Sequence, residues 1–254
     1  MTRDDAPRME VRRAADRFVT VEPGRTTRHS FSFGRHYDPD NVGIADLVAH
    51  NDDLVGPGAG YPEHPHRDLE IVTWVLSGTL RHEDSTGHAG EIRAGTVQRL
   101  SAGRGIRHTE VNPDREDPVH FVQMWVLPDE PGLEPSYEQR DVDADLGRGG
   151  WVSLASGSQA YADDPAVRLC NSRAVLHAAR LHRGESLRLP DPHGARPGET
   201  SVLHLFVARG GVEMEVLGEL DTGDAARLFG AGGQLLTAPN EAEVLLWEMH
   251  PGPR

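Results

Sequence analysis

Short apolar runs separated by turn residues make up most of this chain. Runs rich in β-branched and aromatic residues, such as Phe18 to Val21, Leu69 to Leu76 and Val119 to Leu127, are followed by Gly, Pro, Asn or Asp. Breaks of this kind every ~8–12 residues are typical of an all-β sandwich or barrel. One such break is expected at Asn51 to Asp53, after the run Gly43 to His50. No strand alternates with a long amphipathic helix, so a doubly wound α/β fold is not expected.

The rhythm of strands and turns is interrupted once, in a stretch rich in Pro, Gly, Asp and Glu. We therefore predict an N-terminal domain at 1–135, an exposed connector at 136–150 and a C-terminal domain at 151–254. Residues 1–17 are charged and weakly patterned, which predicts an arm that frays or pairs at a sheet edge. The two halves have similar length and similar rhythm, so we expect two β-barrel or jelly-roll domains in tandem.

Composition and charge limit the classes of partner. The formal net charge is −14 with a pI of about 5.4, which opposes direct binding to nucleic acid. No apolar run approaches the ~18–20 residues of a membrane helix, and the charged N-terminus has no apolar core of a secretory signal. A single cysteine, Cys170, cannot close an intrachain disulfide. We therefore expect a cytoplasmic protein without a membrane partner.

Candidate chemistry is concentrated in two short pieces between Gly58 and Asn112. The first is His64-Pro65-His66 and the second is His108-Thr109-Glu110. In a strand, side chains at i and i+2 point to the same face. Two imidazoles on one strand, facing an imidazole and a carboxylate on another, form a four-ligand set for a divalent transition metal. The candidate metal ligands are His64, His66, His108 and Glu110.

The same stretch resembles a known family. The segments HPHRDLEIVTWVLSG and GTVQRLSAGRGIRHTE, followed by HFVQMWVLP, closely resemble the pirin family of two-domain cupins over roughly residues 20–137. The resemblance implies an all-β bicupin fold. The C-terminal half has neither an HxH nor a His-x-Glu piece, so we expect its cupin-like domain to lack the metal motif. The resemblance also implies one mononuclear metal, iron first, with copper, nickel, cobalt, manganese or zinc as alternatives.

Two glutamates compete as the fourth ligand. The family resemblance implies Glu110, two residues after the last histidine, whereas a generic cupin would use Glu70, four residues after the second one. Glu70 keeps the parity of His64 and His66 if one strand runs through them without a bulge. We favour Glu110 because both i, i+2 pairs are then used. Glu70 would then orient a ligand histidine or pair with an arginine.

Other polar residues near the motifs have weaker claims. Gln123 is predicted to share a strand face with Trp125 and to hydrogen-bond a ligand inside the barrel, while Arg67 lies beside the ligands. His82 and His88 flank a turn and are expected to be exposed loop residues, with the rim of the pocket as the alternative position for either.

The resemblance also implies an activity. Bacterial pirin-like proteins are similar to quercetin 2,3-dioxygenases, so we expect a dioxygenase that opens a flavonol-like aromatic enol with O2, with Glu110 as the catalytic base. The alternative is a regulatory protein that depends on its metal or redox state and docks on a protein partner such as a transcription factor or an enzyme. No organic cofactor is expected.

Overall fold

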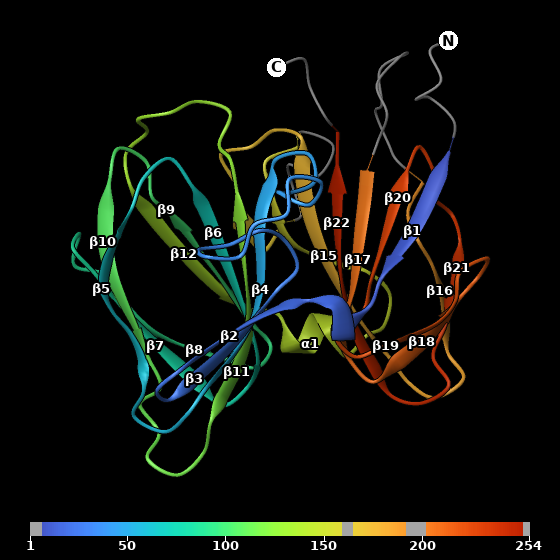
Figure 1. Ribbon diagram of the computed structural model, residues 1–254, viewed down its shortest axis with the longest axis horizontal. Helices are drawn as coiled ribbons and strands as arrows, with labels where there is room; N and C mark the ends of the chain where they lie inside the picture. Colours follow the sequence, from blue (N-terminus) through green and yellow to red (C-terminus); the bar gives the residue numbers. More distant parts are fainter. Residues whose placement is uncertain (1–6, 159–164, 192–201, 251–254) are drawn as a thin grey trace.

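The computed structural model of the 254-residue chain describes residues 7–158, 165–191 and 202–250. These residues form two β-rich halves that lie side by side, with one short helix between them (Figure 1). The strands of the first half are β2 (Phe18–Glu22), β3 (Arg25–His29), β4 (Leu47–Val55), β5 (Gly60–His66), β6 (Glu70–Ser77), β7 (Thr79–Asp84), β8 (Ala89–Arg93), β9 (Thr96–Ser101), β10 (Ile106–Val111), β11 (Val119–Val126) and β12 (Ser136–Asp141). The predicted all-β fold is confirmed.

The second half repeats the pattern. Its elements are β13 (Val152–Ser156), β14 (Val167–Arg168), β15 (Ala174–Leu181), β16 (Ser186–Arg188), β17 (Val202–Arg209), β18 (Gly211–Met214), β19 (Gly218–Asp221), β20 (Ala225–Phe229), β21 (Leu235–Thr237) and β22 (Ala242–Met249). The remaining elements are β1 (Arg8–Arg12), the 3-10 turn η1 (Ala14–Asp16) and the helix α1 (Asp143–Leu146).

Each half is a sandwich of a seven-stranded and a four-stranded sheet. In the first half the orders are β12-β9-β6-β11-β4-β3-β2 and β5-β10-β7-β8. In the second half they are β1-β20-β17-β22-β15-β13-β14 and β16-β21-β18-β19. The orders correspond strand by strand, with β9-β6-β11-β4 matching β20-β17-β22-β15, so the architecture is duplicated although the residues are not repeated.

The N-terminal arm joins the second half. Strand β1 pairs antiparallel with β20, and Met9 lies opposite Leu228. The described part of the predicted arm therefore forms an edge strand, while residues 1–6 lie outside the described residues. The division of the chain into domains at 135 and 151 stays a prediction.

The segment 136–150, predicted as an exposed connector, is mostly exposed but contains regular structure. It contains β12, which pairs with β9 along its whole length, and α1, which buries Leu146. Its acidic residues are compatible with an edge strand because one side of such a strand faces solvent.

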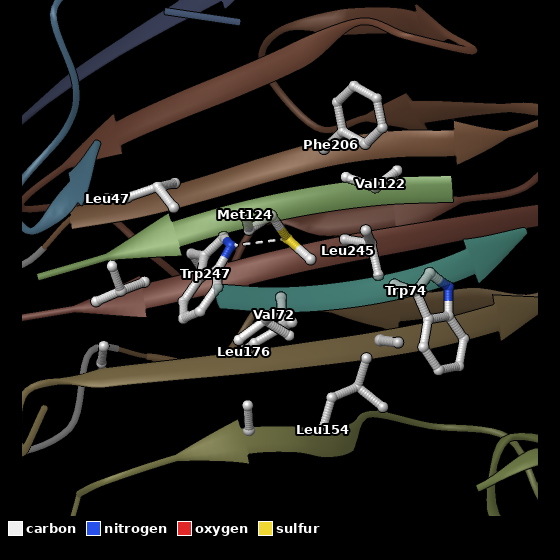
Figure 2. Close-up of a cluster of buried hydrophobic side chains, with 14 of the residues drawn as sticks. Leu47, Val72, Trp74, Val122, Met124, Leu154, Leu176, Phe206, Leu245 and Trp247 are labelled. Atoms are coloured by element: carbon white, nitrogen blue, oxygen red, sulfur yellow. Dashed lines mark hydrogen bonds between the residues drawn. The ribbon is translucent and has the colours of Figure 1, made fainter. Parts of the chain in front are cut away.

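The largest hydrophobic core lies between the two halves. The outer faces of the two seven-stranded sheets pack together through side chains such as Trp74, Met124 and Trp247, all fully buried (Figure 2). The indole N–H of Trp247 points at the Met124 sulfur at 3.2 Å. Burial of apolar surface of this kind is worth about 25 cal/mol per Å², so this core holds the halves in a fixed relation. No helix in the described part of the chain has the length and hydropathy needed to cross a bilayer.

The predicted break at Asn51 to Asp53 is wrong, because β4 runs through it to Val55. The three polar side chains are buried and each has partners. Asn51 contacts the His29 ring at 2.9 Å. Asp52 pairs with Arg17 at 3.1 Å. Asp53 accepts a hydrogen bond from the Tyr61 hydroxyl at 2.5 Å. These tertiary partners outweigh the turn preference of the isolated residues.

Candidate metal centre

Three neighbouring strands of the four-stranded sheet β5-β10-β7-β8 carry the candidate ligands. In the register of β10 against β5, His108 lies opposite His64. In the register of β10 against β7, Glu110 lies opposite His82 and His108 lies opposite Asp84. A bulge in the β5–β10 pairing separates the His108 and Glu110 positions. Strand alternation therefore sends both predicted i, i+2 pairs to one face of this sheet.

The structure brings the three predicted histidines together. His64, His66 and His108 each offer a ring nitrogen, and these atoms all lie within 4.8 Å of one another. The ring of His108 lies 4.4 Å from that of His64 and 4.9 Å from that of His66, measured between centroids. Three imidazoles at this spacing match the nitrogen ligands of a transition metal.

Two of these imidazoles have a buried nitrogen without a partner. The Nε2 atoms of His66 and His108 are buried and make no hydrogen bond within the described residues. Burial, followed by the neighbouring imidazoles, lowers the pKa of His66 to about 4 and of His108 to about 3. Both rings are therefore neutral near pH 7, the form that binds a metal. An unsatisfied buried acceptor is costly, and a metal ion would remove that cost.

Glu110 is held in a defined orientation. The Gln123 amide Nε2 donates to both carboxylate oxygens of Glu110, at 2.8 and 2.9 Å. The indole N–H of Trp125 donates to the Gln123 side-chain oxygen at 3.0 Å and so fixes which end of the amide faces Glu110. Glu110 is 2% exposed and forms a second candidate ligand group with His108 and His82.

His82 is a residue of the site that the sequence reasoning placed wrongly. It was expected in an exposed loop, but it lies on β7 with a fully buried side chain. Its Nδ1 is 3.3 Å from His108 Nδ1, and its Nε2 is 3.3 Å from Asp84 Oδ2. His82 and Asp84 form another i, i+2 pair, and this spacing is the signal that could have found them. His88, in contrast, is 48% exposed, as expected.

Glu70 lies in a different environment. The argument that it shares the parity of the histidines fails, because β5 ends at His66 and β6, in the other sheet of the sandwich, begins at Glu70. The chain turns between them at Asp68, whose φ is +50°. The Glu70 carboxylate accepts hydrogen bonds from the Ser101 hydroxyl at 2.8 Å and from the Cys170 backbone N–H at 3.0 Å. It thus links the first half to the second.

Arg67 points to solvent. Its side chain is 71% exposed and pairs with Asp68 at 3.3 Å. Such an exposed ion pair contributes little to stability.

A pocket of about 460 Å³ opens onto the cluster. It lies within the first half and has His64, His66 and Glu110 in its wall. The remaining lining residues combine aromatic and polar side chains: Thr20, Val21, Glu22, Arg25, Thr27, His29, Phe33, Gly34, Arg35, Asn51, Asp53, Tyr61, Gln123 and Trp125. A concave site of this size with a few convergent polar groups suits a small organic ligand.

One carboxyl of the pocket has an unusual pKa. Burial raises the pKa of Asp53 to about 7, although hydrogen bonds from Thr27 and Tyr61 act in the opposite direction. The neighbouring carboxylates of Asp52 and Glu110 also raise the pKa of Asp53. The pocket therefore contains a carboxyl group that is partly protonated near neutral pH.

Comparisons with known proteins point in one direction. The family model described as Pirin matches residues 9–126. A Mycobacterium tuberculosis protein that carries the provisional name of a quercetin 2,3-dioxygenase is 51% identical over 242 residues, covering 95% of each chain. The crystal structure of YhhW from Escherichia coli superposes with a TM-score of 0.86 at 32% identity, covering 97% of this chain and 100% of that one. Bacterial pirin YhhW in complex with nickel(II) superposes with a TM-score of 0.85 at 29% identity, covering 96% of this chain and 100% of that one.

Proposed function

Because this chain belongs to the pirin family, we propose that it is a metal-dependent dioxygenase of flavonol-type substrates. The two-domain cupin fold that the sequence predicted is that of its relatives and is confirmed. We propose one divalent transition metal, held by four side chains: His64, His66, His108 and Glu110. Iron remains the metal we propose for the cell.

The observation that carries the proposal is the pair of unpartnered buried Nε2 atoms, on His66 in the pocket wall and on His108 beside it. The Nε2 atoms of His66 and His108 have no hydrogen-bond donor among the described residues. One ring nitrogen from each of His64, His66 and His108 lies within 4.8 Å of the other two. The Nδ1 of His64 is 2.8 Å from the Pro62 carbonyl oxygen, to which a proton on this nitrogen would be donated. That hydrogen bond would leave Nε2 of His64 as the free acceptor, as in metal-bound histidines. The donor set therefore fits a first-row metal.

The pocket suits a flat aromatic substrate. Trp125 packs edge-on against His66 at 4.9 Å and against Phe33 at 5.1 Å, measured between ring centroids. His29 stacks on Phe33 at 4.9 Å. Aromatic walls favour an aromatic ligand through stacking and edge contacts, and the polar groups of Thr27, Asn51 and Asp53 on the same pocket wall suit its hydroxyl groups.

When bound, the metal would supply Lewis-acid chemistry toward an enol oxygen and a redox centre for dioxygen. The side chains of this chain do the rest. A Glu110 carboxylate oxygen takes the proton of the substrate hydroxyl, and Gln123 keeps that carboxylate in place through its two hydrogen bonds. The aromatic walls exclude water from the electron-rich anion. In the overall reaction both oxygen atoms of O2 enter the product, and one ring carbon leaves as carbon monoxide.

The test is flavonol turnover by protein loaded separately with iron, copper, nickel, cobalt or manganese. Loss of flavonol absorbance and release of carbon monoxide should occur together in a one-to-one ratio. Metal-free protein and His108→Ala are the inactive controls, and Glu70→Gln is the matched carboxylate control, which should keep activity because Glu70 faces Ser101 and Cys170. No carbon monoxide with any of the five metals would refute the proposed activity.

A further inference from the structure

A row of three buried side chains extends from the Nδ1 side of His108. His108 Nδ1 lies 3.3 Å from His82 Nδ1, and His82 Nε2 lies 3.3 Å from Asp84 Oδ2. The side chains of His82 and Asp84 are fully buried, and His108 is 1% exposed. Strand register creates the row, since Asp84 on β7 lies directly opposite His108 on β10. The proposed reaction makes no use of it.

Asp84 is anchored by the turn that follows β7. Its Oδ1 accepts the backbone N–H of Thr86 at 2.8 Å, the Thr86 hydroxyl at 2.6 Å and the backbone N–H of His88 at 3.2 Å. These three donors occupy one carboxylate oxygen and fix the plane of the group. The other oxygen, Oδ2, lies within hydrogen-bond distance of His82 Nε2, at 3.3 Å, while the His88 ring nitrogen Nδ1 is farther away, at 3.6 Å.

The row permits one arrangement of protons when all three groups are in their usual neutral-pH forms. A carboxylate only accepts hydrogen bonds, so Nε2 of His82 carries the proton that points at Asp84. Nδ1 of a neutral His82 is then an acceptor, and it receives the N–H of His108 Nδ1. His108 is thereby left with its lone pair on Nε2, the buried atom that lacks a partner.

We propose that Asp84 and His82 are positioning residues that hold His108 in the tautomer and ring orientation that present Nε2 to the metal. This inference rests on the proposed function only in that it assumes the same metal site. A ligand histidine commonly donates its second N–H to a carboxylate, a backbone carbonyl or water, and losing that partner typically weakens metal binding 10- to 100-fold. Here His82 transmits the effect of the carboxylate, whereas His64 uses the Pro62 carbonyl directly.

Four variants of the full chain test this role: Asp84→Asn, His82→Leu, His82→Gln and the control Glu83→Gln. Glu83 is an exposed neighbour on the same strand, so its variant should behave as the wild type. The measurements are the nickel(II) dissociation constant by chelator competition, the visible spectrum of the cobalt(II)-loaded protein, and the melting temperature of the metal-free protein. Asp84→Asn and His82→Leu should each weaken nickel binding about 10- to 100-fold and change the cobalt spectrum. His82→Gln should recover much of the affinity, because its amide oxygen can accept the His108 N–H.

Two results would overturn the inference. One is wild-type nickel affinity and cobalt spectrum in both Asp84→Asn and His82→Leu. The other is a loss of nickel affinity that parallels a loss of melting temperature, with His82→Gln binding nickel no more tightly than His82→Leu. That result would mean that His82 and Asp84 have only a structural role. A wild-type protein that holds nickel but does not turn over flavonol refutes the proposed activity and leaves this inference standing. A wild-type protein that binds neither nickel nor cobalt refutes the metal site and this inference together.

Discussion

A pair of buried histidines between the two halves should make the protein sensitive to acid. His204 on β17 and His50 on β4 lie edge to face, with ring centroids 5.1 Å apart. Both ring nitrogens of His204 are buried and make no hydrogen bond within the described residues. Burial lowers the pKa of His204 well below its ordinary value, and the positive charges of Arg227 and Arg17 act in the same direction. His204 is therefore neutral in the folded protein over the whole range in which it would protonate in the unfolded chain.

The sign and size of the effect follow from proton linkage. Because the folded-state pKa is depressed, the unfolded chain binds one more proton per histidine below a pH of about 6.5, so acid favours unfolding. Each such histidine lowers the free energy of unfolding by about 1.4 kcal/mol between roughly pH 7.5 and roughly pH 5.5. His50, whose pKa burial lowers to about 3, contributes in the same window. The loss of stability due to each histidine is complete only when the pH falls below the folded-state pKa of that histidine.

The perturbation is His204→Leu, which removes the titrating ring but keeps an apolar side chain beside Phe31 and His50. Urea unfolding of metal-free protein at several pH values gives the free energy of unfolding in each case. The difference between wild type and variant isolates His204, because other histidines change equally in both proteins. The variant should lose about 1.4 kcal/mol less stability than the wild type between the two pH values.

The matched control for this experiment is His182→Gln. The side chain of His182 is 69% exposed, and the Glu241 carboxylate raises its pKa, so its removal should not reduce the sensitivity to acid. If His204→Leu unfolds with the same pH dependence as the wild type, His204 is not held neutral and the reasoning from burial is refuted.

Three further predictions concern the pocket and the contact between the halves. Glu110→Gln should bind less metal, determined by elemental analysis, and should lose at least about 100-fold of flavonol turnover, since the proposed base is gone. The wild type should lose no more than about 4 kcal/mol of stability as the pH rises from about 4 to about 7, because burial raises the folded-state pKa of Asp53. Asp53→Asn should remove this loss, as measured by urea midpoints across the same pH range. Trp74→Phe removes the indole donor that lies 2.8 Å from Glu243 in the second half, and should lower the free energy of unfolding by about 1–3 kcal/mol, as followed by urea unfolding at neutral pH.

Strand positions could be predicted where local pattern and tertiary structure agree. The runs Leu69 to Leu76 and Val119 to Leu127 became β6 and β11 almost residue for residue, because their apolar residues are buried on both faces. The HxH and HxE pieces also lie on strands, so the i, i+2 alternation of strand side chains correctly predicted that His64, His66 and His108 lie close together. Period-two alternation is a local property, and the sequence carries it directly.

Residues whose role depends on a distant partner could not be predicted in this way. Asn51 to Asp53 look like a turn until their partners on β3, β5 and β11 are known. His82 looks like a loop residue because one of its packing partners, Tyr137, whose ring lies 5.0 Å away, comes from β12 in the other sheet. Glu70 competed with Glu110 as the fourth ligand because the turn at Asp68, which sends Glu70 to another sheet, cannot be seen in the residue spacing.

The duplicated architecture lets the strands that hold the histidine cluster be compared with their counterparts in the second half. Strands β16 and β21 occupy the places of β5 and β10, but the pair that lies at their end is Ser186 and Thr237, whose hydroxyls contact each other at 2.9 Å. The second half packs against the back of β11, whose two faces contact different parts of the protein. Gln123 faces the pocket and orients Glu110, whereas Met124, the next residue, packs against Trp247 of the second half. A close-packed core behind a strand limits the movement of that strand. The interface between the halves therefore fixes the strand that positions the proposed base, and loosening this interface should disturb catalysis before it disturbs the histidine cluster on β5 and β10.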